Sequence, residues 1–165
     1  MSVITFHLHC FSIKLRVAPA EIYQNLSHHS MIKQLSITTP DQGLHEITAR
    51  IEAMINESEM GDGLCTVFLQ HTSASLLIQE NADPAARRDL EKWMNRLVPE
   101  DDPLYTHVNE GPDDMPSHIK STLTANSLTI PFIQGRLALG TWQGVFLWEH
   151  RHGGGHRNLV IHLAP

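Results

Sequence analysis

The chain has 165 residues, of which 41% are hydrophobic and 18% are charged. This length suits one domain with a substantial core and is short for two. The composition excludes an intrinsically disordered chain, and no segment approaches the roughly 20 apolar residues that span a bilayer. The formal net charge of −6, with scattered Lys and Arg, disfavours a broad nucleic-acid interface. We therefore expect one domain that binds neither nucleic acid nor membrane.

The first thirty residues differ from the rest of the chain. They mix apolar, basic and histidine side chains without a helical or alternating pattern. Lys14 and Arg16 follow the most apolar part, whereas a signal peptide carries its basic residues first. Met31 offers a second start of translation. We expect residues 1–30 to be an N-terminal extension, either flexible or a mis-assigned start, and residues 31–165 to form the single domain.

Cysteine usage is sparse. Cys10 and Cys65 lie far apart, and neither belongs to a pair with the spacing of metal ligands. This pattern favours a reduced, cytoplasmic setting.

Three helices are predicted from the spacing of apolar residues and from capping signals. The first has apolar residues at helical spacing and ends before the Gly-Asp-Gly at 61–63. The second begins at 81–84, where Asn81, Asp83 and Pro84 are typical of a helix start. Asp113 or Asp114 can cap a third, after an irregular loop over 99–112. The residues expected to face the core are Leu44, Ile47, Ile51, Met54 and Ile55 in the first helix, Ala86, Leu90, Trp93 and Leu97 in the second, and Ile119 and Leu123 in the third.

Short apolar runs rich in β-formers, separated by turn residues, predict about seven strands. They fall at residues 32–38, 64–70, 75–79, 127–132, 136–139, 144–148 and 158–163. Because strands cluster toward the C-terminus, the pattern indicates an α+β fold, not a doubly wound parallel sheet.

Three polar blocks carry the chemistry, and each lies at the end of a predicted element: HTSAS from His71, DDMPSHIK from Asp113 and GTWQGVFLWEHR from Gly140. Three imidazoles with one open position are a common catalytic zinc site, so His71, His118 and His150 are candidate metal ligands and catalytic groups. The alternative is three hydrogen-bonded, partly buried histidines.

Two carboxylates next to these histidines have equally open roles. Asp114 and Glu149 can orient an imidazole, complete a metal shell or act as a general base. Alternatively, Asp114 caps its helix and Glu149 pairs with Arg151 or a neighbouring strand.

Four basic residues are candidates to hold phosphate oxygens, although each alone is more often a solvated surface charge: Arg87, Lys120, Arg136 and Arg151. The chain has no phosphate-binding loop of the GxxxxGK[ST] type and no GxGxxG sequence, so nucleotide sites of those kinds are unsupported. Ser73 and Ser75 give weak support to a serine hydrolase, because the chain lacks a G-x-S-x-G turn.

The three blocks, extended as HTSASLLIQENADP, EGPDDMPSHIK and GRLALGTWQGVFLWEHR, resemble the YjbQ-like family, also described as secondary thiamine-phosphate synthases. The resemblance runs from about Met31 to Leu163. It implies an α+β fold with a two-sheet β-sandwich, a homotrimer, and a cluster of His71, His118 and His150. Its supporting polar groups would be Asn81, Asp114 and Glu149.

The activity implied by the resemblance joins a hydroxymethylpyrimidine diphosphate to a thiazole phosphate and releases diphosphate. Its cofactor would be a divalent metal. Histidine ligands favour zinc or another transition ion, with magnesium as an open alternative. Two other functions stay open: a metal-dependent hydrolase of a small phosphorylated or acyl substrate, and a non-catalytic trimeric protein that binds a metal or anion. The residues favour an enzyme that takes a small phosphorylated substrate.

Overall fold

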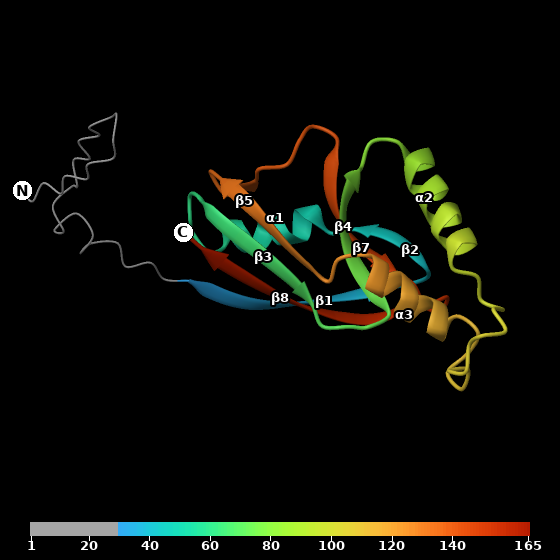
Figure 1. Cartoon of the computed structure of the whole chain (residues 1–165). Coiled ribbons are helices and arrows are strands. Elements are labelled where there is room, and N and C mark those ends of the chain that lie inside the picture. Colours follow the sequence, from blue (N-terminus) through green and yellow to red (C-terminus); the bar gives the residue numbers. More distant parts are fainter. Residues whose placement is uncertain (1–29) are drawn as a thin grey trace, which may run out of the picture.

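The computed structural model describes residues 30–165, so the predicted extension lies outside the described residues except for Ser30. The described part of the chain is an α+β fold of eight strands and three helices (Figure 1). In chain order these are β1 (Met31–Thr39), β2 (Gly43–Glu46), α1 (Thr48–Asn56), β3 (Gly63–Leu69), β4 (Ala74–Glu80), α2 (Pro84–Leu97), α3 (Asp114–Leu123), β5 (Ser127–Ile133), β6 (Arg136–Leu137), β7 (Gln143–Glu149) and β8 (Gly155–Ala164).

The strands form two antiparallel sheets. One has the order β1-β8-β3-β5-β6, and the other has the order β2-β7-β4. The predicted α+β class is confirmed, with one strand more than expected. The additional strand is β2, in which Leu44 pairs with Trp148 of β7. The first predicted helix was therefore too long at its start, because Leu44 fits the helical spacing but is part of the sheet.

Alternation of buried and exposed residues along β8 builds one side of the core. Leu159, Ile161 and Leu163 are fully buried, and they meet buried residues of both sheets and of α1 in one cluster. Full burial of each such side chain contributes about 1.5–3 kcal/mol. Arg157 occupies the same face of β8 and is also buried. A charged residue at a core position of a strand indicates a special role.

Helix α2 begins as predicted, since Asp83 Oδ1 accepts a hydrogen bond from Ala85 N at 2.7 Å and Pro84 is the first helical residue. Its buried face differs from the prediction. Met94 is buried, whereas Trp93 and Leu97 are 49% and 51% exposed. Neighbouring helix residues point about 100° apart, so the helix packs on the face next to the one that the spacing indicated.

Helix α3 packs against β4, an edge strand of the three-stranded sheet. Ser121 Oγ donates to Ala74 O at 3.0 Å, which ties the helix to the first residue of β4. Ile119 is partly buried as expected, but Leu123 is 57% exposed. Ala74 at the start of β4 pairs with Glu149 at the end of β7, and α3 packs beside β4, so these three elements meet at one end of the molecule (Figure 1).

Over residues 30–165, none of the helices has the length and apolar character needed to cross a membrane. The cytoplasmic setting stays a prediction.

Candidate functional site

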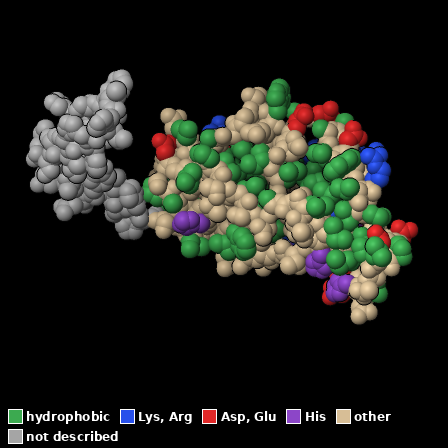
Figure 2. Space-filling view, in the orientation of Figure 1, with side chains coloured by type: hydrophobic (Ala, Val, Ile, Leu, Met, Phe, Trp, Pro, Cys, Tyr) green, Lys and Arg blue, Asp and Glu red, His purple; other side chains and the backbone are tan. Residues whose placement is uncertain are grey.

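An open pocket of about 610 Å³ lies where α3, the loop before β4 and the turn between β7 and β8 meet. Its walls come from all three blocks that the sequence singled out, together with a residue of β8. In the space-filling view, two neighbouring histidine side chains lie over α3 and the loop before it (Figure 2). The lining residues that carry the chemistry are His71, Asp113, Asp114, His118, Arg151 and Arg157.

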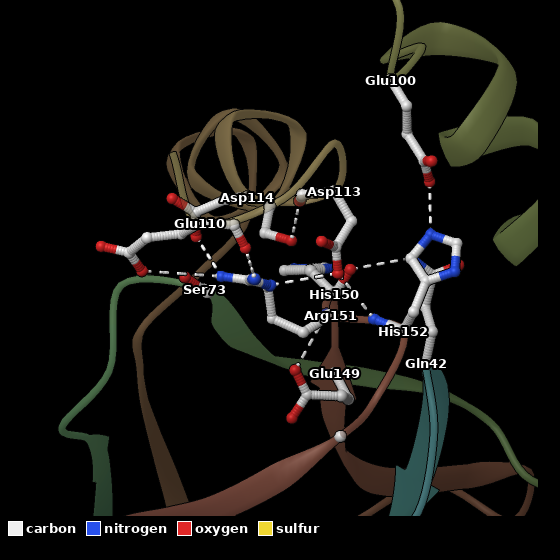
Figure 3. Close-up of polar contacts among 12 residues, drawn as sticks. Gln42, Ser73, Glu100, Glu110, Asp113, Asp114, Glu149, His150, Arg151 and His152 are labelled. Carbon is white, nitrogen blue, oxygen red and sulfur yellow. Dashed lines mark hydrogen bonds and ion pairs between the residues drawn. The ribbon is translucent and has the colours of Figure 1, made fainter. Parts of the chain in front are cut away.

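Arg151 fixes the two adjacent aspartates at the start of α3 (Figure 3). Its Nε donates to Asp113 Oδ2 at 3.0 Å, and its Nη1 pairs with Asp114 Oδ1. Nη2 also donates to the carbonyl oxygen of Glu110 at 2.7 Å. Asp113 occupies the cap position of α3, but its side chain makes no capping hydrogen bond. Both carboxylates therefore serve the pocket, and the helix-capping alternative for Asp114 does not hold.

The second oxygen of Asp114 is left without a donor. Asp114 is 1% exposed, and its Oδ2 has no hydrogen-bond partner among residues 30–165. Oδ2 nevertheless lies 2.7 Å from His107 Nε2 and 3.5 Å from His118 Nε2. Neither contact has the alignment of a hydrogen bond. A buried carboxylate oxygen without a donor is costly unless a cation or a proton reaches it.

The orientation of His118 makes the contact between its Nε2 and Asp114 Oδ2 more unfavourable. Its Nδ1 lies 3.1 Å from the carbonyl oxygen of Thr72. A carbonyl oxygen can only accept, so Nδ1 carries the hydrogen and the neutral ring presents a lone pair at Nε2. Two acceptors, His118 Nε2 and Asp114 Oδ2, thus face one another. A backbone carbonyl that holds Nδ1–H in this way is the usual arrangement around a metal-bound histidine.

The donor set fits a divalent metal. One ligand atom each from His107, Asp114 and His118 lies within 4.8 Å of the other two. Two imidazoles and one carboxylate with open positions match catalytic zinc and other first-row transition ions. Magnesium prefers oxygen ligands and fits this set less well.

His71 and Arg157 form the other half of the pocket. Ser73 N donates to His71 Nδ1 at 3.0 Å, so the neutral ring carries its hydrogen on Nε2. Nε2 lies 3.2 Å from Arg157 Nη1, which can only donate. Burial, and next the Arg157 charge, lower the pKa of His71, which favours the neutral ring. Two donors therefore face each other here, and an oxyanion can accept from both.

Glu149 supports Arg157 from beneath the pocket. It is fully buried and accepts from Arg157 Nη2 at 2.8 Å, Thr39 Oγ1 at 2.8 Å and Arg151 N at 3.0 Å. Burial alone raises the pKa of Glu149, but these hydrogen bonds, led by that from Arg157, bring it below its usual value. Glu149 is thus an ionised counter-ion that positions Arg157. The ion pair that was expected between Glu149 and the Arg151 side chain is replaced by a hydrogen bond from the Arg151 backbone N–H.

His150 does not join the other two predicted metal ligands within the chain. Successive residues of a strand point to opposite sides, so Glu149 reaches Arg157 while His150 turns toward Ser75. Its Nε2 lies 2.9 Å from Ser75 Oγ, and His150 lines a different cavity. The predicted cluster of three histidines is replaced by a cluster in which His107 and Asp114 accompany His118.

Of the four basic residues predicted to hold phosphate and the supporting residue Asn81, only Arg151 lines the pocket, and the other four lie away from it. Asn81 follows the far end of β4 and contacts Glu46. The Arg87 guanidinium stacks over the ring of Phe146, 5.8 Å from its centroid. Arg136 is exposed on β6, and Lys120 is buried behind α2, where its Nζ donates to Asn95. Three of these four side chains have structural partners that spacing along the chain did not reveal.

Sequence reasoning missed His107 and Arg157. His107 is an exposed residue in the irregular loop, and its only signal was that a long loop in a compact domain is often functional. Arg157 had a stronger signal, because it continues the buried alternation of Leu159, Ile161 and Leu163. An arginine on the apolar face of a strand requires a buried partner.

The fold and pocket define an α+β protein with two antiparallel sheets and a histidine-carboxylate site beside a buried arginine. Residues 33–165 match the family model described as UPF0047 protein YjbQ-like. The chain belongs to this family.

Named relatives and solved structures agree with this assignment. The chain is 52% identical over 130 residues to UPF0047 protein sll1880 of Synechocystis, which covers 79% of this chain and 88% of the relative. It is 44% identical to UPF0047 protein YjbQ of Escherichia coli O157:H7, covering 79% and 95%. A conserved hypothetical protein from Thermus thermophilus superposes with a TM-score of 0.72 at 36% identity, covering 79% and 98%.

These comparisons correct the predicted activity. The relatives carry only UPF0047 family names, and a Sulfolobus solfataricus structure with the same fold, at 20% identity and a TM-score of 0.75 over 83% of this chain and 98% of its own, is described as a YbjQ-like protein of unknown function. None of them bears a thiamine-phosphate synthase name. The prediction of a thiamine-phosphate synthase is therefore wrong, while the predicted family is confirmed.

Proposed function

We propose that the pocket is the divalent-metal centre of an enzyme that acts on a small phosphorylated substrate. The observation that carries this proposal is the meeting of two acceptors, His118 Nε2 and the buried Asp114 Oδ2, at 3.5 Å. A metal ion held by both atoms and by His107 Nε2 satisfies all three at once. Zinc or another first-row transition ion suits the ligands best.

Two of the three ligands have a neighbour that holds them in place. Thr72 O keeps His118 in the tautomer that binds metal, and Arg151 holds Asp114 through its other oxygen. When bound, a divalent ion would polarise a substrate oxygen and lower the pKa of a water molecule. The residues themselves therefore orient two of the metal ligands.

The phosphate group is assigned to the other half of the pocket. His71 Nε2–H and Arg157 Nη1 converge at 3.2 Å and can both donate to one phosphate oxygen. Arg157 is held rigidly by Glu149, so little side-chain entropy is lost on binding. Arg151 is already paired with two aspartates and contributes less to the anion.

Elemental analysis of protein purified without an affinity tag tests the metal centre. We expect near-stoichiometric metal in the wild type and its loss in His107→Ala, which removes an exposed loop residue with little effect on the fold. His45→Ala is the matched control, because this partly exposed histidine lies in β2, outside both cavities. Metal bound equally by all three proteins would reject the centre.

The anion half is tested by calorimetric titration of zinc-loaded protein with inorganic phosphate. His71→Ala should weaken binding by about tenfold, since one hydrogen bond to a charged group contributes roughly 1.5–3 kcal/mol. Release of phosphate from p-nitrophenyl phosphate then separates an enzyme from a protein that only binds. Binding of metal and phosphate without turnover of several phosphomonoesters would retain the site and reject the enzyme.

A homotrimer is the second part of the proposal. It is supported by large apolar side chains that one chain leaves exposed, among them Ile32 at 70%, Trp93 at 49% and Trp142 at 65%. Light scattering after size-exclusion chromatography tests it. The expected mass is three times 18.6 kDa, and a monomeric mass at micromolar concentration would reject the trimer.

A further inference from the structure

A second cavity, of about 290 Å³, lies between α2, the start of β2 and the end of β7. It shares no lining residue with the metal pocket. Two predicted site residues that the metal centre does not use lie at this cavity. His150 forms part of its wall, and Lys120 lies behind the lining residue Asn95. Its lining residues are Gln42, Gly43, Arg88, Glu91, Lys92, Asn95, Trp148 and His150.

Lys120 is a buried cation without a contact ion pair in the described part of the chain. It is 2% exposed, and its only hydrogen bond within residues 30–165 runs from Nζ to Asn95 Oδ1 at 2.6 Å. A buried ammonium that lacks a counter-ion is costly. An anion in the adjoining cavity would reduce that cost.

Lys120 also fixes how the amides around the cavity are oriented. The ammonium requires the oxygen of Asn95, so Asn95 Nδ2 faces Gln42 Oε1, to which it donates at 2.9 Å. Gln42 Nε2 in turn donates to the carbonyl oxygen of His150 at 2.7 Å. Each amide nitrogen has two hydrogens, and among the described residues each makes one hydrogen bond. One N–H of Asn95 and one of Gln42 are thus available to a ligand.

The charges around the cavity select the type of ligand. Arg88 and Lys92 line it with positive charge, and Lys120 adds a third cation behind the wall. Glu91 is the one lining carboxylate, and its Oε1 already accepts from Leu44 N at 2.8 Å. With Lys120, the cations outnumber this single negative charge, so the cavity attracts an anion. Trp148 offers apolar surface for the body of the ligand.

We propose that this cavity is a second ligand site, which binds a small organic monocarboxylate through the amides of Gln42 and Asn95 and the cations Arg88 and Lys92, with Lys120 adding positive charge from behind Asn95. The carboxylate accepts from the amides, and the apolar part of the molecule rests on Trp148. This site is separate from the metal centre, and its ligand needs neither metal nor phosphate.

Titration of the ¹⁵N-labelled full chain with benzoate tests the proposal, and the side-chain amide signals of Asn95 and Gln42 are the readout. Benzamide is the neutral isostere. We expect saturable shifts with benzoate, affinity for benzamide at least about tenfold weaker, and a dissociation constant about tenfold higher in Lys92→Ala. Lys92 is a rim residue, so this variant should fold even if Lys120→Met does not. His118→Ala, which removes a metal ligand, should bind benzoate as the wild type does.

Three results would overturn the proposal: no saturable shift of either amide, equal binding of benzamide and benzoate, or shifts produced by inorganic phosphate in place of benzoate. Loss of benzoate binding in His118→Ala would also overturn it, because the two sites would then be one. Failure of the metal centre alone leaves the benzoate result unchanged.

Discussion

His118 Nε2 and Asp114 Oδ2 lie 3.5 Å apart across one turn of α3, with no hydrogen bond between them. The two residues are four positions apart, so they share one face of the helix. Thr72 O accepts a hydrogen bond from His118 Nδ1, and Arg151 Nη1 donates to the other oxygen of Asp114, Oδ1. The groups around this pair therefore orient two lone pairs toward a common point, where a cation would be stabilised.

Arg151→Lys should weaken metal binding without removing any ligand. Lysine retains the charge but loses the planar fork that contacts both aspartates and Glu110 O. Loss of a group that holds a metal ligand typically reduces metal affinity by about 10- to 100-fold. Competition with a zinc-binding dye measures this. An unchanged affinity would show that Asp114 needs no support from Arg151.

The buried pair of Arg157 and Glu149 predicts a strong asymmetry between single and double variants. Arg157→Met leaves a fully buried carboxylate without its main partner and should lower the free energy of unfolding by about 3–5 kcal/mol. Arg157→Met combined with Glu149→Leu should recover most of this loss, because the uncompensated charge is gone. Urea denaturation gives the values. Additive losses in the double variant would contradict the coupling.

The strand β2, which contains Leu44, is the part of the fold that could not be predicted from the sequence. Turn residues and alternation predicted seven of the eight strands, because each of those strands has local signals. β2 has only four residues and joins β7 through contacts distant in sequence. Its apolar residue also fitted the helical spacing of α1. No local rule separates those two outcomes.

The residues of the candidate site were also predicted only in part. His71, Asp114, His118 and Arg151 were predicted because they sit at the ends of elements, and the fold brings those ends together. His150 was misplaced because the histidine and Glu149 point to opposite sides of β7, and no count of histidines shows which side faces the pocket. His107 could not be placed, since the route of an irregular loop depends on tertiary contacts.

His150 predicts how stability depends on pH. Burial, then the nearby Lys120 charge, lower the pKa of His150 from 6.5 to about 3. Well above pH 6.5 the imidazole is neutral in both states. As the pH falls below 6.5 the unfolded chain binds a proton that the folded chain excludes, so stability is lost progressively until about pH 3.

Near pH 5 this histidine alone should cost about 2 kcal/mol relative to pH 7.5. His150→Gln removes the titrating group and should flatten that part of the profile. His71, whose pKa is also lowered, contributes in the same direction in both proteins and cancels in the comparison. Urea denaturation of both proteins from pH 7.5 to pH 5 gives the difference. Parallel profiles would show that His150 is protonated in the folded protein.

The most direct test of the metal centre is a long-range ¹H–¹⁵N spectrum of the histidine rings, recorded before and after addition of one equivalent of zinc. We expect that His118 has its hydrogen on Nδ1 and that zinc shifts the Nε2 signals of His118 and His107, while those of His150 stay unchanged. Zinc-induced shifts at His71 and His150 without a shift at His107, or a hydrogen on Nε2 of neutral His118, would contradict it.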